Sequence, residues 1–480
     1  MRTVVALLAS LALAADLTTA GPAGRTPADG AERPCLSVKL TQSDGGEVVK
    51  MQLDDYVAAV LAGECSIFRS DEALKAMAVA ARTYAVRLRG RHAKDGYDFC
   101  ATTHCQRVDQ KAVTARLQAI ADDTSGELLW FEGKPAFACY TRDCGGRTED
   151  AQAVWQDLAA PYLVSHDDPY CQRSGAERWH WSGTPQQILA ALQQSGLRAP
   201  PLIDQIAIRQ TTASGRAQVL VLRGAGQVVP VSATSFRFAL GRAIGWDTLR
   251  SDLYRVTMSS GRAVFDGTGA GHGVGLCQRG ADRMGLEGRT YREILRFYYP
   301  GTAVGLTARG LTWNRLGGEL VTLMTTQPNQ DNFIVEQAER SARALSERTK
   351  LPLPRKIEIR IYPDLDTFRN ATGAPGTVAG QTRGSRIDLQ PVAVLRRREV
   401  FDSTLRHELL HVLVENRARP DLPIWFREGL VEYLDGSRRS ARVNALVSRY
   451  GADAVLTWLT RGLPPEVKNS SDSKAAVNSK

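Results

Sequence analysis

A His-Glu-Leu-Leu-His string occupies residues 407–411, and its spacing fits metal chemistry. On a helix, two histidines separated by three residues lie one turn apart on the same face. His407 and His411 could therefore bind one zinc ion together and leave further coordination positions open. Glu408, next to the first histidine, would then take a proton from a water molecule bound to the metal. The string predicts a zinc site with Glu408 as general base.

Two helices must position these groups. The first carries the string, and apolar neighbours supply the flank that buries such a helix, namely Leu405, Leu409, Leu410, Val412 and Leu413. The second helix is expected to begin near Pro423, because proline suits the first turn of a helix. It would bring Glu428 to the metal as third ligand, with Glu432, one turn further along, as second choice.

The string Trp-Phe-Arg-Glu-Gly-Leu-Val-Glu-Tyr at residues 425–433 makes the motif more specific. Together the two strings resemble the gluzincin metallopeptidases, particularly the small peptidase MA-like domains. In that family the Glu of the Glu-Gly pair is the third zinc ligand, which maps to Glu428. The resemblance implies a zinc metallopeptidase domain that acts on a peptide or protein. The alternative is a scaffold that keeps the zinc motif without turnover.

A second group of candidate residues lies near the N-terminus. One helix is expected from Leu53, and an alanine-rich helix is expected over residues 71–85, where an acidic first turn favours its start. Glu64 lies between them. Its neighbours, among them Gly63 and Cys65, could raise its pKa by partial desolvation, as a general acid near neutral pH requires. The alternative is a solvated Glu at a helix end.

The strings at residues 55–64, 72–85 and 269–281 occur in an order that resembles the SpoIID/LytB family. The resemblance covers about residues 36–303. Characterised members of this family are exported bacterial proteins that cleave peptidoglycan glycan strands as lytic transglycosylases. The family's catalytic residue maps to Glu64. A single carboxyl can protonate the leaving oxygen and then deprotonate the 6-hydroxyl of the sugar, so a second carboxylate is not required.

Further members of these strings are candidates for substrate binding: Arg82, Tyr84, His272 and Gln278. His272 lies among glycines, which permit unusual dihedral angles or a close approach of substrate. It could bind substrate or, alternatively, fix the loop that carries it. The family more often has Ser at the position of Cys277, so a role for a hydroxyl group is in doubt at this position.

The chain has eight cysteines, and all of them precede residue 280. In an exported protein an even number of cysteines suggests disulfides, for example Cys100–Cys105 and Cys139–Cys144. Cys100, His104 and Cys105 could instead hold a structural zinc, as in one subset of the family, although the fourth ligand is open and the spacing of nearby His92 differs from that subset. Free thiols are the third alternative.

The chain of 480 residues is too long for one compact core, so more than one domain is expected. The expected fold class is α+β, with a mixed α/β N-terminal domain and a zincin-like C-terminal domain made of a small sheet and an active-site helix. Pattern and composition indicate a signal peptide at 1–20, a flexible leader at 21–34 and a disordered tail at 464–480. The two resemblances imply a SpoIID/LytB-like domain at 35–305 and a gluzincin-like domain at 326–463, with a linker or sheet edge at 306–325 between them.

The net charge of +10 suits an anionic partner, but the charge is scattered and no basic stripe interleaved with aromatic residues is present. We therefore expect no nucleic-acid partner, and no transmembrane helix beyond the signal peptide. Together the two resemblances imply an exported wall enzyme that cleaves glycan strands and carries a zinc peptidase domain. The alternatives are a non-catalytic wall-binding module that targets a zinc protease, and a glycan lyase with an inactive zincin scaffold.

Overall fold

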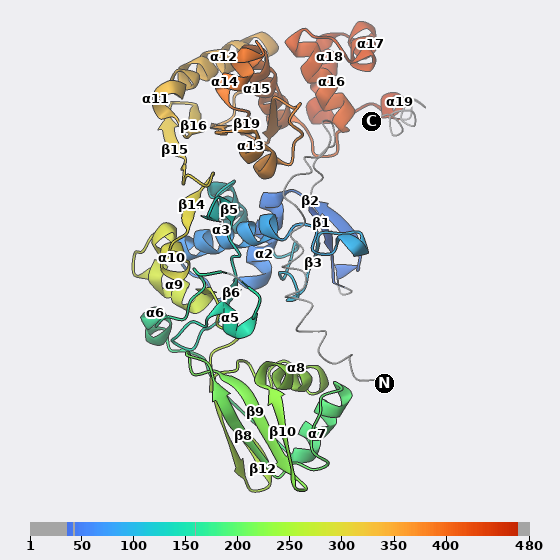
Figure 1. Ribbon diagram of the computed structural model, residues 1–480. Helices are drawn as coiled ribbons and strands as arrows, with labels where there is room; N and C mark the ends of the chain where they lie inside the picture. The colour runs from blue at the N-terminus through green and yellow to red at the C-terminus, as the bar shows by residue number, and fades with distance from the viewer. Residues whose placement is uncertain (1–35, 42–43, 159, 469–480) are drawn as a thin grey trace. The chain divides into compact units, whose positions relative to one another are not determined.

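The computed structural model describes residues 36–41, 44–158 and 160–468 (Figure 1). Within these residues the chain forms two compact units, one that ends at Gly310 and one that begins at Leu311. The expected signal peptide and leader, residues 1–34, and the last part of the expected tail, residues 469–480, lie outside the described residues. Among the residues described, every helix is too short or too polar to span a lipid bilayer.

The first part of the first unit packs short helices and small sheets against an alanine-rich helix. In chain order to the middle of the unit, the elements are β1 (Leu36–Lys39), β2 (Val48–Met51), α2 (Leu53–Glu64), α3 (Asp71–Arg87), η2 (Ala93–Asp95), β3 (Phe99–Cys100), α4 (Ala115–Asp123), β4 (Leu128–Phe131), β5 (Lys134–Pro135), β6 (Tyr140–Thr141), α5 (Ala151–Val154) and α6 (Pro169–Arg173). Helix α3 begins where the Ser70 side chain accepts a hydrogen bond from the amide of Ala73. It is the alanine-rich helix expected from the sequence, and its alanines let neighbouring helices approach closely.

The rest of the first unit includes two three-stranded antiparallel sheets with a core of their own. The elements are β7 (Arg178–Gly183), α7 (Pro185–Gln194), β8 (Gln205–Thr211), β9 (Ala217–Gly224), β10 (Gln227–Ser232), α8 (Ala233–Ala243), β11 (Tyr254–Ser259) and β12 (Arg262–Thr268). We call residues 178–268 the inserted subdomain. Its strands and helices form one cluster in Figure 1.

After the inserted subdomain the chain returns to the first core. Strand β13 (Leu276–Cys277) pairs in parallel with β6, and β14 (Ala303–Gly305) pairs antiparallel with β4. Between them lie α9 (Gln278–Leu286) and α10 (Tyr291–Tyr298). This return places the Gly-His-Gly segment, residues 271–273, beside β6.

The second unit is built on a five-stranded sheet in the order β15-β16-β17-β19-β18, with parallel pairs at its centre and antiparallel pairs at its edges. Its elements are β15 (Asn314–Gly317), β16 (Val321–Thr325), α11 (Pro328–Asp331), α12 (Phe333–Thr349), β17 (Ile357–Ile361), α13 (Leu365–Thr372), β18 (Gly380–Arg383), β19 (Arg386–Leu389), α14 (Val392–Arg397), α15 (Phe401–Arg417), α16 (Ile424–Asp435), α17 (Ala441–Tyr450), α18 (Ala452–Arg461) and α19 (Pro465–Lys468). The helix expected over the histidine string is α15, and the helix expected near Pro423 is α16.

The mixture of helices and small sheets confirms the expected α+β class. Two segments differ from expectation. The segment 306–325 is not only a linker, because β16 lies inside the sheet with its apolar side chains buried. Residues 465–468 of the expected disordered tail form α19, since Val467 is buried in the core of the second unit.

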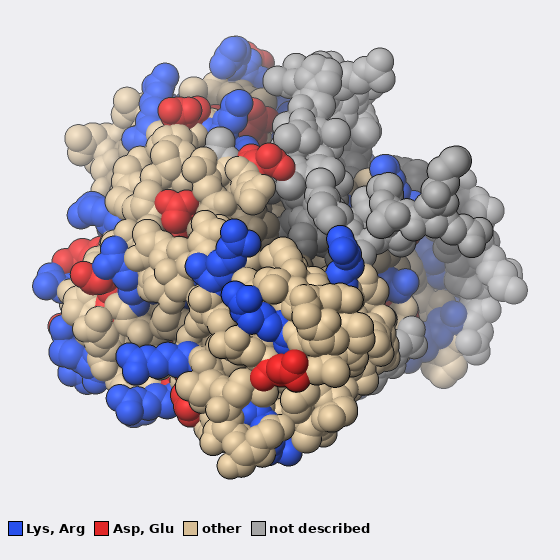
Figure 2. Space-filling view, turned by 60° about the horizontal axis from the view of Figure 1, so that its bottom comes forward, with Lys and Arg blue, Asp and Glu red and all other residues tan. Residues whose placement is uncertain are grey.

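On the face drawn in Figure 2, Lys and Arg side chains are spread among acidic and uncharged residues. This distribution agrees with the scattered charge of the sequence. Most of the positive charge on that face is therefore solvated surface, where isolated charges contribute little to folding stability.

Candidate functional site

The second unit brings the three predicted zinc ligands together. The Nε2 atoms of His407 and His411 lie 3.2 Å apart, and the Glu428 carboxylate lies 3.6 Å from the first and 3.2 Å from the second. Ligands bound at about 2.0–2.1 Å to one tetrahedral zinc ion lie roughly 3.3–3.4 Å apart. The three side chains could therefore hold one zinc ion with little movement. Within the described residues, Glu432 is not part of this group, which favours Glu428 as third ligand.

Two further residues orient this group. Asp435, at the end of α16, accepts a hydrogen bond of 2.8 Å from Nδ1 of His407. Such a carboxylate fixes the tautomer of a metal-binding histidine and points its other nitrogen at the metal. On the opposite side, the Thr382 hydroxyl donates to the Glu408 carboxylate over 2.8 Å. Neither Asp435 nor Thr382 was predicted from the sequence.

Glu408 is almost completely buried, and burial raises the pKa of its carboxyl group. Hydrogen bonds from His407 and His411 lower the pKa of Glu428, so the carboxylate remains charged beside the two imidazoles. The three ligands and Glu408 line an open cleft of about 690 Å³. The cleft also has Arg398 and Arg439 in its wall. The arrangement leaves room for water and for a polar substrate next to the proposed metal.

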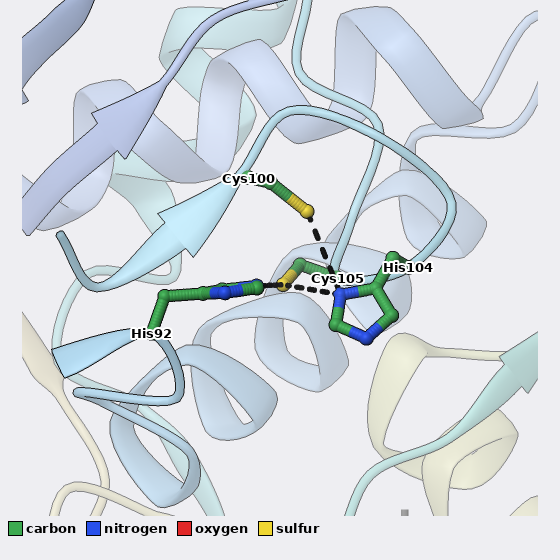
Figure 3. A group of neighbouring side chains, drawn as sticks. All are labelled: His92, Cys100, His104 and Cys105. Carbon is green, nitrogen blue, oxygen red and sulfur yellow. Dashed lines mark hydrogen bonds between the residues drawn. The ribbon is translucent and has the colours of Figure 1, made fainter. Parts of the chain in front are cut away.

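In the first unit, a second group of soft ligands forms around the expected Cys100, His104 and Cys105 (Figure 3). His92, whose spacing left the fourth ligand open, completes the group. Its Nε2 lies 3.4 Å from Sγ of Cys105, and Nδ1 of His104 lies 3.7 Å from each sulfur. Asp95 bonds to Nδ1 of His92 over 3.1 Å and so orients the ring.

The seven described cysteines are all free, so the suggested disulfides Cys100–Cys105 and Cys139–Cys144 are absent. Cys139 and Cys144 lie in different surroundings, since Cys144 contacts Cys277 and Asp168. The hydrogen bond from Cys105 lowers the pKa of Cys100 to about 3, which favours one thiolate in the pair. Thiolate sulfur is a ligand that zinc prefers.

Glu64 is the last residue of α2 and contacts the loop that contains Arg107. Its Oε1 accepts a hydrogen bond of 2.8 Å from the amide of Arg107. Gly63 allows this approach, because a Cβ there would lie 2.5 Å from the Arg107 carbonyl oxygen. Burial raises the pKa of Glu64, although the amide of Arg107 partly opposes the shift. The carboxyl group can therefore keep its proton at a higher pH than a solvated Glu.

His272 lies in the first unit, in the loop between β12 and β13. Its Nδ1 accepts a hydrogen bond of 3.0 Å from the amide of Val274, and its ring contacts Trp155 edge-on. Burial lowers the pKa of His272 to about 3, so the ring is neutral near pH 7. The bond from Val274 and the contact with Trp155 favour the second expected role, in which His272 fixes its loop.

The other three predicted substrate-binding residues lie in the core, which corrects that prediction. Arg82 is fully buried and forms an ion pair of 3.1 Å with buried Asp54. Tyr84 is buried next to Phe99, and its hydroxyl accepts a hydrogen bond from Arg91. Gln278 is buried in the first turn of α9. Every residue of α3 from Ala76 to Ala85 is buried, so this part of the helix has no face left for a glycan.

Arg82→Met is expected to lower the free energy of unfolding by about 3–5 kcal/mol, because it leaves the Asp54 carboxylate buried without its cation. Urea unfolding followed by circular dichroism measures the change. Arg89→Met is the control, since Arg89 is partly exposed and lies 3.9 Å from Asp98. It should change stability by less than about 1 kcal/mol. Equal effects of the two substitutions would contradict the structural role of Arg82.

Residues 41–131 match the family model described as SpoIID, stage II sporulation protein. This segment contains Glu64 and the group formed by His92, Cys100, His104 and Cys105, which we call the His92 cluster. An uncharacterised protein of Brachyspira hyodysenteriae is 30% identical over 259 residues, which cover 54% of this chain and 67% of that protein. Two relatives from Bacillus subtilis have descriptive names. Stage II sporulation protein D is 27% identical over 286 residues, covering 56% of this chain and 79% of the relative.

The other relative from Bacillus subtilis is an amidase enhancer. It is 26% identical over 288 residues, which cover 51% of this chain and 39% of the relative. These matches extend over little more than half of this chain, and the family model falls entirely within the first unit.

Proposed function

The chain belongs to the stage II sporulation protein D family through its first unit, and from this premise we propose that it is an exported cell-wall protein whose first unit cleaves the glycan strands of peptidoglycan. The observation that carries the proposal is the state of Glu64. It lies inside the segment that matches the family, at the end of α2, with a pKa raised by burial. A carboxyl that keeps its proton to higher pH than a solvated Glu suits the role of a general acid.

The proposed chemistry uses Glu64 twice. As an acid it donates a proton to the oxygen of the glycosidic bond, and that bond breaks. As a carboxylate it then accepts the proton of the 6-hydroxyl on the sugar whose anomeric carbon has lost the leaving oxygen. The 6-oxygen bonds to that carbon and closes an anhydro ring. Protons balance without a water molecule. The amide of Arg107 donates to the carboxylate, so it would hold Glu64 in one orientation through both steps.

The proposal is tested with peptidoglycan whose stem peptides have been removed, so that only glycosidic bonds can be cut. The full chain with His407→Ala and His411→Ala should release soluble glycan fragments as fast as the unchanged protein, because the zinc site has no part in this reaction. Absence of soluble fragments with both proteins would refute glycan cleavage by the first unit.

For the second unit, we propose a zinc metallopeptidase site with His407, His411 and Glu428 as ligands and Glu408 as general base. The support is the 3.2–3.6 Å spacing of the ligand atoms together with the bond from His407 to Asp435. A bound zinc ion would polarise water and a peptide carbonyl. Glu408, held by Thr382, would remove the proton from that water. A stem peptide or a wall protein is the proposed substrate.

Asp435→Asn is expected to weaken zinc binding by the second unit about 10–100-fold, because the charged partner of His407 is lost. Competition with a chromophoric chelator measures the affinity. Asp453→Asn, in α18 and outside the cleft, is the control. An affinity that stays unchanged with Asp435→Asn would contradict the orienting role of Asp435.

We further propose that His92, Cys100, His104 and Cys105 hold a structural zinc ion in the first unit. All four coordination positions would be taken by side chains, which suits a structural rather than a catalytic site. The ion would fix the loop that follows β3, and that loop continues to Arg107 and its bond with Glu64.

The similarity to an amidase enhancer favours a second candidate function. In that case the first unit would bind the wall without cutting it and assist another enzyme, here the zinc site of the second unit. Glu64→Gln would then leave glycan binding and biological activity intact. The proposed lyase would instead lose its products.

A further inference from the structure

Three buried cysteines and one buried aspartate meet in the first unit, away from the His92 cluster and from Glu64. Cys144 follows β6, Cys171 lies in α6 with Asp168 as the residue that caps it, and Cys277 ends β13 and caps α9. Their ligand atoms all lie within 4.8 Å of one another. Neither the proposed lyase chemistry nor the family comparison gives this group a role.

The contacts within the group match the spacing of a closed metal site. Sγ of Cys144 lies 3.3 Å from Oδ2 of Asp168. Sulfur at about 2.3 Å and carboxylate oxygen at about 2.0–2.2 Å from one zinc ion lie roughly 3.5–3.7 Å apart in a tetrahedron. All four side chains are buried, so water from bulk solvent would not serve as a ligand.

The surrounding backbone also fits sulfur that carries negative charge. Cys277 Sγ accepts hydrogen bonds from the amide of Cys144 over 3.2 Å and from the amide of Gly280 over 3.5 Å. The second amide is in the first turn of α9, where the helix dipole favours an anion. A Cβ on Gly280 would lie 2.5 Å from Oδ2 of Asp168, so only glycine lets the helix approach the group.

Outer partners fix the carboxylates. The Tyr298 hydroxyl donates to Oδ2 of Asp168 over 2.8 Å, as residues around bound metals commonly do. Asp143 accepts a hydrogen bond of 3.1 Å from Sγ of Cys171, but Arg279 and the amide of Gly145 hold its two oxygens. The amide of Cys171 likewise donates to Oδ1 of Asp168 over 2.9 Å. An oxygen of Asp168, and not of Asp143, belongs to the four ligand atoms that lie within 4.8 Å of one another, so Asp168 is assigned as the metal ligand and Asp143 as an outer partner.

We propose that Cys144, Cys171, Cys277 and Asp168 bind one structural zinc ion. Three thiolates and one carboxylate are a soft, closed ligand set that suits zinc. Binding would release the three thiol protons to solvent and leave no position for substrate. The chain between Cys171 and Cys277 contains the inserted subdomain, residues 178–268, so the ion would anchor both ends of that subdomain to the core.

A disulfide is the main competing arrangement in an oxidising compartment. It would use two of the three sulfur atoms, and no ion would join the third thiol to Asp168. Three buried thiols without a metal are the other possibility. Both arrangements predict no metal at this position, which separates them from the proposal in one measurement.

The experiment uses the full chain, loaded with cobalt in place of zinc, and needs no activity assay. Thiolate-to-cobalt absorption grows with the number of thiolate ligands. Five cysteine ligands are expected from the two sulfur-containing groups, and Cys100→Ser with Cys105→Ser should remove two of them and leave three. Absorption that disappears completely with Cys100→Ser and Cys105→Ser would overturn the proposal.

Zinc content, measured by elemental analysis, gives a second readout that includes the unchanged protein. Three ions per chain are expected from the three groups, and Cys171→Ser should remove one. Cys65→Ser and Cys139→Ser are controls, because both thiols are buried but lie outside the groups. A zinc content that stays the same with Cys171→Ser would overturn the proposal. A Cys144–Cys277 disulfide in peptides prepared from the unchanged chain without reductant would overturn it even if Cys171→Ser fails to fold.

Discussion

Glu408→Gln is expected to lower peptide hydrolysis by the second unit about 10²–10⁴-fold while zinc content stays unchanged. The amide can still accept the hydrogen bond from Thr382, but it cannot take a proton from water. The ligands His407, His411 and Glu428 are untouched. The rate is measured on isolated stem peptides and on an unfolded protein substrate, with zinc determined in the same samples.

Glu347→Gln is the matched control for this substitution, because it makes the same chemical change at an exposed position of α12 in the same unit. It should leave both rate and zinc content unchanged. If Glu408→Gln and the unchanged protein hydrolyse these substrates equally fast, Glu408 is not the general base. If neither hydrolyses any substrate, the second unit is a scaffold without turnover.

Glu64→Gln is expected to lower the release of glycan fragments about 10²–10⁴-fold, since a carboxamide can act neither as the acid nor as the base. The pH dependence follows from the direction of the pKa shift. Burial raises the pKa of Glu64, so the protonated form persists to higher pH, and cleavage by the unchanged protein should fall as pH rises through that pKa. The rate of fragment release from stripped glycan strands, measured between pH 4 and pH 9, tests both points.

Glu47→Gln serves as the control, because Glu47 is exposed in the same unit and has no proposed part in catalysis. Its rate and pH profile should equal those of the unchanged protein. Equal rates for Glu64→Gln and the unchanged protein would assign catalysis to another residue. Retained glycan binding without any cleavage by either protein would support the wall-binding alternative.

Local patterns were enough to select the three candidate ligands that the second unit brings together, His407, His411 and Glu428. The spacing of His407 and His411 is a property of one helix, and Pro423 marked the start of the next helix. Glu428 could therefore be proposed from the sequence. Asp435 could not, because its contact with His407 depends on how α15 and α16 pack together, and that packing leaves no local signal.

The first unit shows the opposite case. The string around Arg82 was assigned to substrate binding, but every side of α3 near Arg82 is covered by protein. A buried Arg with a buried Asp partner looks the same in sequence as an Arg in a binding site. Burial, and not the string, decides between the two roles.

The spacing of the cysteines in the sequence was also insufficient to predict which of them lie together in the fold. Cys144 and Cys277 are 133 residues apart, yet the amide of one donates to the sulfur of the other. The fold brings them together because β13 pairs with β6 after the chain has completed the inserted subdomain. Pairs close in sequence, such as Cys139 and Cys144, were the natural candidates for a disulfide, but both thiols are free and Cys144 lies against Cys277 and Asp168 instead.

If Glu64 acts as both acid and base, the first unit breaks the glycan without using water. Stripped glycan strands are digested with the unchanged full chain in water enriched in heavy oxygen, and the fragments are weighed by mass spectrometry. The expected fragments have anhydro ends, are one water lighter than hydrolysis products and contain no heavy oxygen. Fragments with reducing ends that carry the heavy oxygen would contradict this mechanism.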